Sequence, residues 1–343
     1  AGHESFVPGA ALVDYGGLAL LLGATVLAAL ACKRGRLPNA WVIGPLLAGH
    51  EMEVADEADL EDRLGEAEVL VCGPLDVGEA LLKGAPRLRL VHQWGVGVDR
   101  IDLEACRKMG VAVCNVPSGG TGNAEGVAEI ALMHLLLHSR KYARCQESIR
   151  KRRLFSPQGV SLWKKRACVV GLGNVGRNVV SRLKGMGMEV RGVNRTERES
   201  FGSLGLDGFY RLDSVEEALS GCRFVVLSLE LNEETREVAS GAFFKAMEPG
   251  SFLVNVGRAE LVSRRALEGS LESGHLAGAG LDVFWDEPAD PDDPLLANPK
   301  VTLTPHVGGV TDKALMGVAQ TVADNISRLE RDLDLLNRLG RER

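Results

Sequence analysis

The segment 166–180, RACVVGLGNVGRNVV, constrains the fold of this chain more than any other stretch. An apolar run ends at Val170, three glycines follow in the pattern Gly-x-Gly-x-x-Gly, and a helix-like stretch comes next. This order predicts a strand, a tight turn and a helix whose first amide groups point at an anion. A glycine-rich turn with no ligand is the alternative. We predict that a dinucleotide binds at Gly171, Gly173, Asn174, Val175 and Gly176.

The stretch GVNRT indicates which dinucleotide is preferred. An acidic residue about twenty positions after the glycines usually holds the ribose hydroxyls of NAD. Here that place is occupied by Asn194, Arg195 and Thr196. Asn194 removes the repulsion that an aspartate would exert on a 2′-phosphate, Arg195 supplies a cation, and Thr196 supplies a hydroxyl. The sequence therefore favours NADP, and NAD stays possible if Arg195 points to solvent.

Composition and charge describe an ordinary α/β enzyme. The chain has 343 residues, a formal net charge of −6 and 25% charged residues, which fits about two domains and gives no field that attracts nucleic acid. Its seven cysteines are scattered and lack the spacing of metal ligands. We therefore predict no metal site and reduced core thiols in the cytoplasm.

An apolar segment near the start, residues 16–36, has the sequence GGLALLLGATVLAALACKRGR. It is short for a membrane span, holds an internal glycine and has no basic region before it. We expect a buried helix or strand pair of the first domain. A membrane-tethered enzyme is the alternative, and it depends on this segment alone.

Apolar runs and helical stretches alternate along the rest of the chain, which predicts parallel sheets with helices on both faces. Four runs precede residue 118, and a second series of six follows from RACVV to VTLTPH. A long helix over residues 124–153, capped by Asn123, connects the two series, and an amphipathic helix over 311–333 returns to the first. The chain is thus expected to form two doubly wound α/β domains, with a nucleotide domain inserted between two pieces of a smaller one.

Three motifs follow successive predicted strands at their carboxyl ends, where ligands bind in such sheets: NVGRAELV, LDVFWDEP and TPHVGG. Together with the upstream GVGVDRID and TGNAEGVAE, and in this order, they resemble the D-isomer-specific 2-hydroxyacid dehydrogenase family. The resemblance extends from about Glu66 to the last helix. It implies a flavodoxin-like substrate domain over residues 1–118, a Rossmann domain over 119–306, and a returning C-terminal segment over 307–343.

The resemblance also assigns the catalytic residues. Arg258 of NVGRA would hold the substrate carboxylate and polarise the keto oxygen, for which a guanidinium is chemically suited. His306 of TPHVGG would act as general acid and base, and Glu287 of WDEP would bind the other imidazole nitrogen and raise the pKa of the histidine. Taken singly, each of these residues also fits a surface or structural role.

Further residues complete the expected site. Asp282 of LDVF would face the nicotinamide carboxamide, or would cap a turn. The backbone around Val96 and Gly97 would bind the substrate carboxylate. His92, His134 and His138 lie outside the family motifs, and we interpret these three as structural.

The implied activity is the NAD(P)-dependent interconversion of a small 2-keto acid and its D-2-hydroxy acid by a homodimer, with neither nucleic acid nor membrane as a partner. The alternatives are 3-phosphoglycerate dehydrogenase, a weaker formate dehydrogenase reading, and a dinucleotide-sensing binding protein like the corepressors that share this fold. Two positions depart from the family pattern: Ala259 follows the arginine where glycine is frequent, and the bulky Trp285 stands near Glu287.

Overall fold

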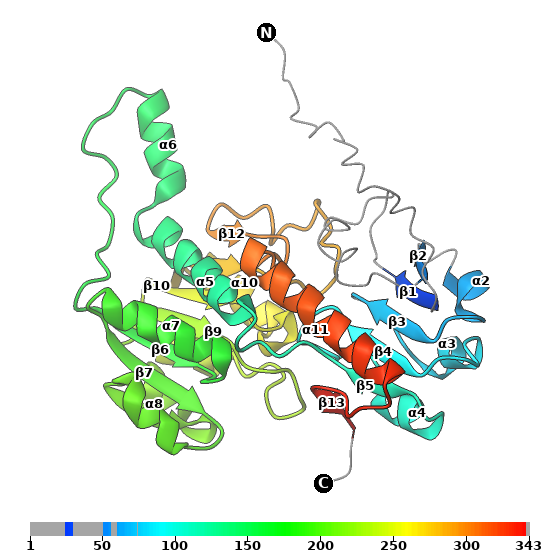
Figure 1. Ribbon diagram of the computed structural model, residues 1–343. Coiled ribbons are helices and arrows are strands. Elements are labelled where there is room, and N and C mark those ends of the chain that lie inside the picture. Colours follow the sequence, from blue (N-terminus) through cyan, green and yellow to red (C-terminus); the bar gives the residue numbers. More distant parts are fainter. Residues whose placement is uncertain (1–24, 30–50, 56–59, 74, 341–343) are drawn as a thin grey trace. The chain divides into compact units, whose positions relative to one another are not determined.

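The computed structural model describes residues 25–29, 51–55, 60–73 and 75–340 (Figure 1). The chain divides into two compact units, Ala1–Pro117 with Leu315–Arg343, and Ser118–Ala314. Each unit contains a largely parallel sheet, which confirms the predicted α/β class with two such sheets. Of the apolar segment 16–36, only the strand β1 (Thr25–Ala29) is described, and the rest lies outside the described residues.

The first unit has the strand order β2-β1-β3-β4-β5-β13. The first five strands run parallel, and β13 lies antiparallel to β5. The order 2-1-3-4-5 is that of a flavodoxin-like sheet, as predicted. The strands after β1 are β2 (Glu51–Ala55), β3 (Val69–Cys72), β4 (Leu90–Gln93), β5 (Ala112–Cys114) and β13 (Arg338–Leu339).

The helices of this unit are α2 (Leu60–Leu64), α3 (Glu79–Lys83), α4 (Leu103–Lys108) and most of α11 (Asp312–Glu330). The apolar face of α11 packs on β3, β4 and β5 through Val318, Val322 and Ile326. The predicted amphipathic helix is therefore present, and it belongs to the core of the first unit. Among the helices in the described part of the chain, none is both long and apolar enough to cross a membrane.

The second unit has the strand order β8-β7-β6-β9-β10-β11-β12, and all pairs are parallel. This is the Rossmann order with one strand added at the β12 edge. The prediction missed β8, because its sequence GFYR is short and only half-buried. The strands are β6 (Arg166–Val170), β7 (Glu189–Asn194), β8 (Gly208–Arg211), β9 (Phe224–Leu227), β10 (Ser251–Asn255), β11 (Leu276–Leu281) and β12 (Val301–Leu303).

Both faces of this sheet are buried. On β6, Ala167 and Val169 pack against α5 and α7, whereas Cys168 and Val170 pack against α8, α9 and α10. A strand buried on both faces is apolar at every position, which is why RACVV shows no alternation. The helices are α5 (Asn123–Ser139), α6 (Tyr142–Arg150), α7 (Asn174–Gly185), α8 (Val215–Leu219), α9 (Gly241–Ala246) and α10 (Arg264–Glu272).

The single helix predicted over 124–153 is wrong. The chain forms α5 and α6, and between them Lys141 adopts a left-handed conformation with φ of 53°. The amide of Val160 in the returning chain donates to the carbonyl of Ser139 at 2.6 Å, so the end of α5 is capped from outside. Asn123 is the first residue of α5 rather than its cap, which is Gly122.

The second unit ends at Ala314, further along the chain than the predicted domain end at residue 306. The cause is local, because the amides of Val307 and Gly308 donate to the carboxylate of Asp282 after β11. The segment that follows His306 is thereby tied to the Rossmann sheet.

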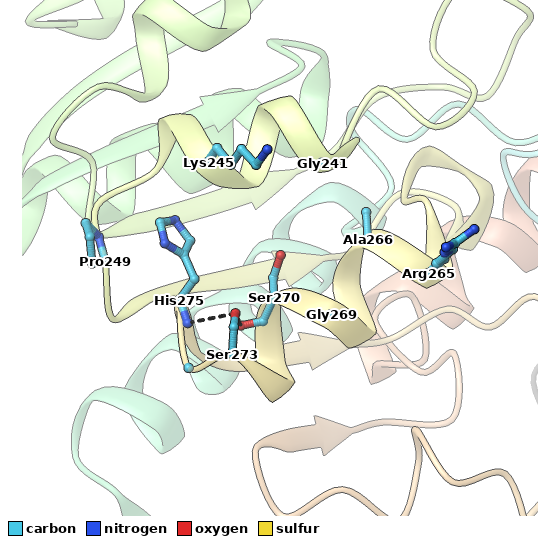
Figure 2. A pocket seen from close by; sticks show the side chains of 10 residues that line it. Gly241, Lys245, Pro249, Arg265, Ala266, Gly269, Ser270, Ser273 and His275 are labelled. Carbon is cyan, nitrogen blue, oxygen red and sulfur yellow. Dashed lines mark hydrogen bonds between the residues drawn. The ribbon is translucent and has the colours of Figure 1, made fainter.

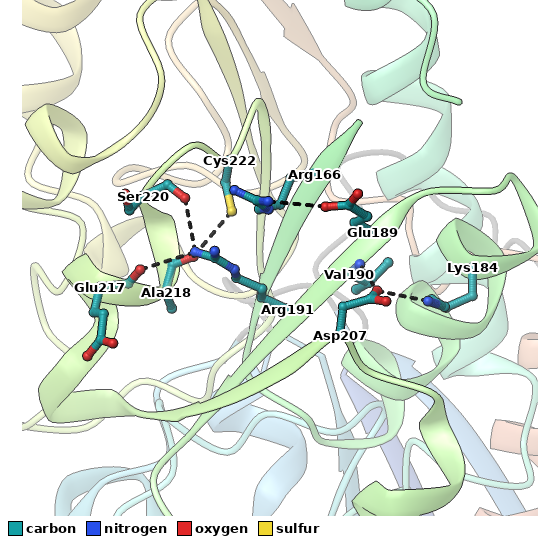
Figure 3. A network of polar contacts seen from close by, with 10 residues as sticks. All are labelled: Arg166, Lys184, Glu189, Val190, Arg191, Asp207, Glu217, Ala218, Ser220 and Cys222. Atoms are coloured by element: carbon teal, nitrogen blue, oxygen red, sulfur yellow. Dashed lines mark hydrogen bonds and ion pairs between the residues drawn. The ribbon is translucent and has the colours of Figure 1, made fainter. Parts of the chain in front are cut away.

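A charged side chain ties β7, the strand that ends in Asn194, to the neighbouring helix α8 (Figure 3). The guanidinium of Arg191 on β7 donates to the carbonyls of Glu217, Ala218 and Ser220 at 2.9–3.2 Å, at the end of α8. A cation suits the carbonyl end of a helix. These bonds hold α8 against β7, and they thereby position the strand end where the cofactor-selective residues were predicted.

Candidate active site

The three glycines of the loop between β6 and α7 have different roles: a left-handed turn at Gly171, close packing at Gly176 and an open backbone at Gly173. Gly171 has φ of +101°, and a Cβ on Gly176 would lie 1.8 Å from the carbonyl oxygen of Gly171. Both positions therefore require glycine for the fold itself. A Cβ on Gly173 would meet no protein atom within 4 Å. The backbone at Gly173, at the start of α7, thus faces open space that an anion can occupy.

The predicted selectivity residues lie at the end of β7. The amide of Leu172 in the glycine loop donates to Oδ1 of Asn194 at 3.3 Å, and Nδ2 of Asn194 donates to the carbonyl of Thr196 at 2.9 Å. Arg195 is exposed, and its guanidinium lies 3.5 Å from the carboxylate of Glu234. The glycine loop and the GVNRT stretch are therefore joined by hydrogen bonds, and a cation stands beside them.

His306 and Glu287 form an ion pair in the second unit. Nδ1 of His306 lies 2.9 Å and 3.0 Å from the two carboxylate oxygens of Glu287, and the amide of Phe284 donates to the same carboxylate at 3.1 Å. Because a carboxylate only accepts, the proton of the neutral imidazole stands on Nδ1. The Nε2 atom is then the position at which a proton is gained or lost.

The pKa values of this pair shift in opposite directions. The hydrogen bond and the charge of Glu287 raise the pKa of His306, although burial and the charge of Arg258 oppose this. Burial by itself would raise the pKa of Glu287, but the hydrogen bond and charge of His306 outweigh it, so that pKa is lowered. The pair is thus stabilised as imidazolium and carboxylate.

Arg258 belongs to the same group. Its charge acts on both His306 and Glu287, and its guanidinium donates to the carbonyl of Gly257 at 2.9 Å. The turn after β10 is held by the buried Asn255, whose amide accepts from the amide of Gly257 and donates to the carbonyl of Arg258. The structure therefore brings the three predicted catalytic residues together.

Asp282 is 2% exposed and binds the loop that carries His306. Its Oδ1 accepts from the hydroxyl of Thr304 at 2.6 Å and from the amide of Val307 at 3.0 Å, and its Oδ2 accepts from the amide of Gly308 at 2.9 Å. The turn-capping interpretation of Asp282 therefore describes its contacts, and its Oδ2 has capacity for one more donor.

Val96 and Gly97 lie in the first unit, in the half-buried turn that follows β4. The carbonyl of Val96 accepts from the amide of Asn115, and Gly95 has φ of +153°. The ring of Trp285, two residues before Glu287, lies 5.6 Å from the guanidinium of Arg264.

The sequence interpretation missed three supporting residues, which are Ser228, Asn255 and Thr304. The hydroxyl of Ser228 donates to the carbonyl of Gly171. All three are polar and directly follow or end a predicted apolar strand. That position was the signal that was overlooked, since a polar side chain at the ligand-binding edge of a sheet has either a ligand or a loop to hold.

Comparison with known proteins identifies the chain. The family model described as D-isomer specific 2-hydroxyacid dehydrogenase, NAD binding domain, matches residues 132–308. The chain belongs to this family. It is an oxidoreductase that acts on the CH–OH group of donors, and its cofactor is a nicotinamide dinucleotide.

Several relatives of this dehydrogenase have names that state an activity. The glyoxylate reductase of Pyrococcus furiosus is 33% identical over 261 residues, which are 74% of this chain and 76% of the relative. The D-3-phosphoglycerate dehydrogenase 2 of Arabidopsis thaliana is 34% identical, over 78% of this chain and 43% of the relative. A solved 2-hydroxyacid dehydrogenase of Ketogulonicigenium vulgare covers 94% of this chain and all of that chain, with 26% identity and a TM-score of 0.79.

The residues of this dehydrogenase fit the cofactor of the family. Gly173 leaves the start of α7 open, so the first amides of that helix would hold the pyrophosphate, and Asn194 and Arg195 would hold the ribose with its substituents. The bound nicotinamide supplies or receives the hydride.

A surface groove of about 620 Å³ lies elsewhere on the second unit (Figure 2). It is found where β10 and β11 begin, whereas the motif residues follow the ends of the strands. None of the predicted site residues is among those that line it: Gly241, Lys245, Pro249, Arg265, Ala266, Gly269, Ser270, Ser273, Gly274 and His275. The groove is therefore separate from the chemistry argued here.

Proposed function

We propose that this dehydrogenase reduces small 2-keto acids of the glyoxylate, hydroxypyruvate or phenylpyruvate kind to D-2-hydroxy acids, and that it oxidises the D-2-hydroxy acid in the reverse direction. The observation that carries the proposal is the ion pair of His306 and Glu287 beside Arg258. A raised histidine pKa and a nearby guanidinium suit a reaction in which a keto oxygen beside a carboxylate takes up a proton.

In this mechanism His306 is the general acid of the reduction. Its Nδ1–H stays hydrogen-bonded to the carboxylate of Glu287. The proton on its Nε2 passes to the keto oxygen as the carbonyl carbon is reduced. Glu287 stabilises the imidazolium before the transfer and keeps the ring oriented after it. In the oxidation the neutral Nε2 accepts the hydroxyl proton, so the same atom acts as general base.

The substrate carboxylate is the second point of recognition. Arg258 has the planar pair of donors that a carboxylate or a keto acid accepts. Val96 and Gly97 would add backbone donors to this carboxylate. The remaining capacity of Asp282 Oδ2 suits the amide hydrogens of the nicotinamide carboxamide.

The preferred cofactor in this proposal is NADP. Asn194 keeps the contact to the glycine loop without a negative charge, and Arg195 is exposed at the position where a 2′-phosphate would lie. Its ion pair with Glu234 is exposed at both side chains, and such pairs contribute about 1 kcal/mol or less. A doubly charged phosphate therefore competes well for Arg195.

The test is the loss of nicotinamide absorbance with NADPH and NADH in parallel, against glyoxylate, hydroxypyruvate, pyruvate and phenylpyruvate. Faster oxidation of NADPH with any of these acids supports the proposal, and equal rates remove the role of Arg195. His306→Ala should abolish turnover and leave cofactor binding intact, as measured by fluorescence titration of NADPH. Cofactor binding by the native chain with no turnover on any acid would favour the dinucleotide-sensing protein.

A second candidate activity is 3-phosphoglycerate dehydrogenase, because curated relatives with that name are 29–34% identical to this chain. Its substrate carries a phosphate and needs an additional basic group near Arg258. Oxidation of 3-phosphoglycerate at a higher kcat/KM than that of D-glycerate would select this candidate. The reverse ranking would retain the small-acid substrate.

We further propose a homodimer formed through the second unit. The segment 140–166, which we call the arm, runs from the end of α5 through α6 and the following loop to the first residue of β6. Its helix α6 and the loop extend away from the sheet of its unit (Figure 1). Its large apolar side chains are exposed, with Leu154 at 81%, Phe155 at 102% and Ile149 at 70%. Exposed apolar side chains gathered on one projection are typical of a protein interface.

A further inference from the structure

A buried row of polar side chains leads to the loop of His306. His134 and His138 on α5 lie against β11, and Thr302 and Thr304 lie on and just after the neighbouring β12. His134 is fully buried, whereas most of α5 that faces the sheet is apolar. The sequence interpretation treated both histidines as structural, but their contacts end at Asp282.

The fold makes room for these rings. A Cβ on Gly280 would lie 2.5 Å from Cβ of His134, and a Cβ on Gly278 would lie 2.5 Å from Nδ1 of His138. Two residues along a strand cover roughly 6.6 Å and four residues along a helix cover roughly 6 Å, so the two spacings match. The glycines of AGAGLDV thus accommodate two imidazoles, one above the other.

The donor and acceptor of each hydrogen bond in the row can be assigned by starting from Asp282. The carboxylate of Asp282 accepts, so the Thr304 hydroxyl donates to it at 2.6 Å. That hydroxyl has only one hydrogen, so it accepts from Nε2–H of His134 at 3.0 Å. Burial lowers the pKa of His134 to about 4, and the ring is therefore neutral near pH 7.

The same reasoning continues to the far end. Nδ1 of the neutral His134 accepts from the Thr302 hydroxyl at 2.7 Å. The oxygen of Thr302 lies 2.9 Å from Nε2 of His138, which donates because it also reaches the carbonyl of Ala279 at 2.8 Å. All donors point towards Asp282, and aligned hydrogen bonds of this kind strengthen one another.

The loop at the end of this row is strained at the proposed catalytic residue. His306 has φ of +53°, a left-handed conformation that costs a residue other than glycine about 1 kcal/mol or more. Three hydrogen bonds hold the loop. The amide of His306 donates to the carbonyl of Thr304, and the amides of Val307 and Gly308 donate to the carboxylate of Asp282. The orientation of Asp282 therefore determines the backbone that presents His306.

We propose that His134 is a positioning residue for His306: it orients Asp282 through Thr304, and Asp282 holds the His306 loop in its left-handed conformation. This rests on the proposed role of His306 as general acid and base. The alternative is a purely structural pair of core histidines. The two differ in whether the loss of the His134–Thr304 bond changes the chemistry at His306 or only the stability of the fold.

The first test compares two substitutions of His134. His134→Asn keeps an amide near the position of Nδ1 but is too short to reach Thr304, whereas the longer His134→Gln keeps a donor near the position of Nε2. We expect His134→Asn to lower kcat about tenfold with the KM for the cofactor within about twofold, and His134→Gln to restore most of it. Glu287 and Asp282 raise the pKa of His306 and Arg258 lowers it, and the net effect is an increase. A displaced His306 would lose part of this increase, so the alkaline limb of the reduction should also move to lower pH in His134→Asn.

The second test asks whether His134 acts through Thr304. Thr304→Val removes the hydroxyl and keeps the shape, and it should give the same loss as His134→Asn. If Thr304 mediates the effect, the double variant is no slower than Thr304→Val alone. Multiplied losses would overturn the proposal, and Thr304→Val carries the test if His134→Asn fails to fold.

Two further variants separate the possible failures. Ser139→Ala removes a buried hydroxyl of the same helix, which donates to the carbonyl of Leu136, and it should leave the alkaline limb in place. His306→Gln tests the proposed function itself. If His306→Gln is inactive but His134→Asn has native kcat and a native pH limb, the positioning role is wrong and the general acid stands. If His306→Gln turns over normally, the proposed function is wrong.

Discussion

The proton on Nε2 of His306 should set the pH range of the reaction. In the proposed mechanism reduction requires the imidazolium of His306, whose pKa is raised chiefly by the hydrogen bond to Glu287. Reduction kcat/KM should therefore be constant below the raised pKa and fall tenfold per pH unit above it, while oxidation shows the opposite limb. Glu287→Gln removes the charge that raises the pKa, so the alkaline limb of the reduction should move to lower pH. Parallel pH profiles of both directions measure this.

Glu268→Gln is the matched control for that profile. Its carboxylate pairs with Arg264 on α10 and is not among the charges that shift the pKa of His306, so the limb should not move. An identical alkaline limb in the native enzyme and in Glu287→Gln would show that Glu287 does not tune His306.

The proposed cofactor selectivity also depends on single residues. Glu234→Gln removes the partner of Arg195, and we expect the KM for NADPH to fall about twofold to fivefold, because the exposed pair no longer competes with a phosphate. The double variant Asn194→Asp with Arg195→Asp should shift the preference towards NADH. The ratio of kcat/KM for the two cofactors measures both changes. A ratio that does not respond to either variant would mean that Arg195 points to solvent.

The sequence predicted the proposed reacting groups, but it did not predict the residues that support them. Arg258, Glu287 and His306 stand in short motifs whose order along the chain carries the resemblance. His134 and Thr304 are 170 positions apart, and neither segment has a sequence pattern that predicts the hydrogen bond between them. A lone histidine on an apolar helix fits a core position equally well, so the distinction needed the arrangement of α5, β11 and β12.

At the scale of elements, the turn between β6 and α7 offers a matched pair of substitutions. Gly176→Ala would place a methyl group 1.8 Å from the carbonyl of Gly171, whereas Gly173→Ala would meet no protein atom within 4 Å. We expect Gly176→Ala to lower the melting temperature strongly or to prevent folding. Gly173→Ala should melt like the native protein but bind NADPH at least tenfold more weakly, because the methyl occupies space meant for the pyrophosphate. Thermal melting and cofactor titration separate the two effects, and native affinity in Gly173→Ala would place the cofactor elsewhere.

Element types followed well from the sequence, but two elements depended on contacts that it does not display. The six predicted strands of the second unit are all present, since a strand buried on both faces is a continuous apolar run. β8 lies at the edge and lacks such a run. The end of α5 is set by Val160, a residue of the returning chain, so the helical periodicity alone extended it too far.

At the scale of the whole molecule, charge is unevenly distributed along the chain. The arm, residues 140–166, holds ten lysines and arginines and one acidic residue, Glu147, which gives it a net charge of 10 − 1 = +9. The complete chain carries −6, so the remainder carries −6 − 9 = −15. A second copy of the chain is therefore an electrostatically complementary partner for the arm, and its exposed apolar side chains supply the area to be buried.

The proposed dimer should depend on this arm. Ile149→Asp with Phe155→Asp introduces charge into the exposed apolar cluster and should convert a dimer into a monomer at micromolar concentration, as measured by sedimentation equilibrium. Leu333→Asp changes an exposed apolar residue of the first unit and is the matched control, which should remain dimeric. If charge complementarity contributes, the dissociation constant of the native dimer should rise between low and high salt, because salt screens the attraction between exposed charges. A double variant that sediments as a dimer would place the interface outside the arm, and a native chain that sediments as a monomer would reject the homodimer itself.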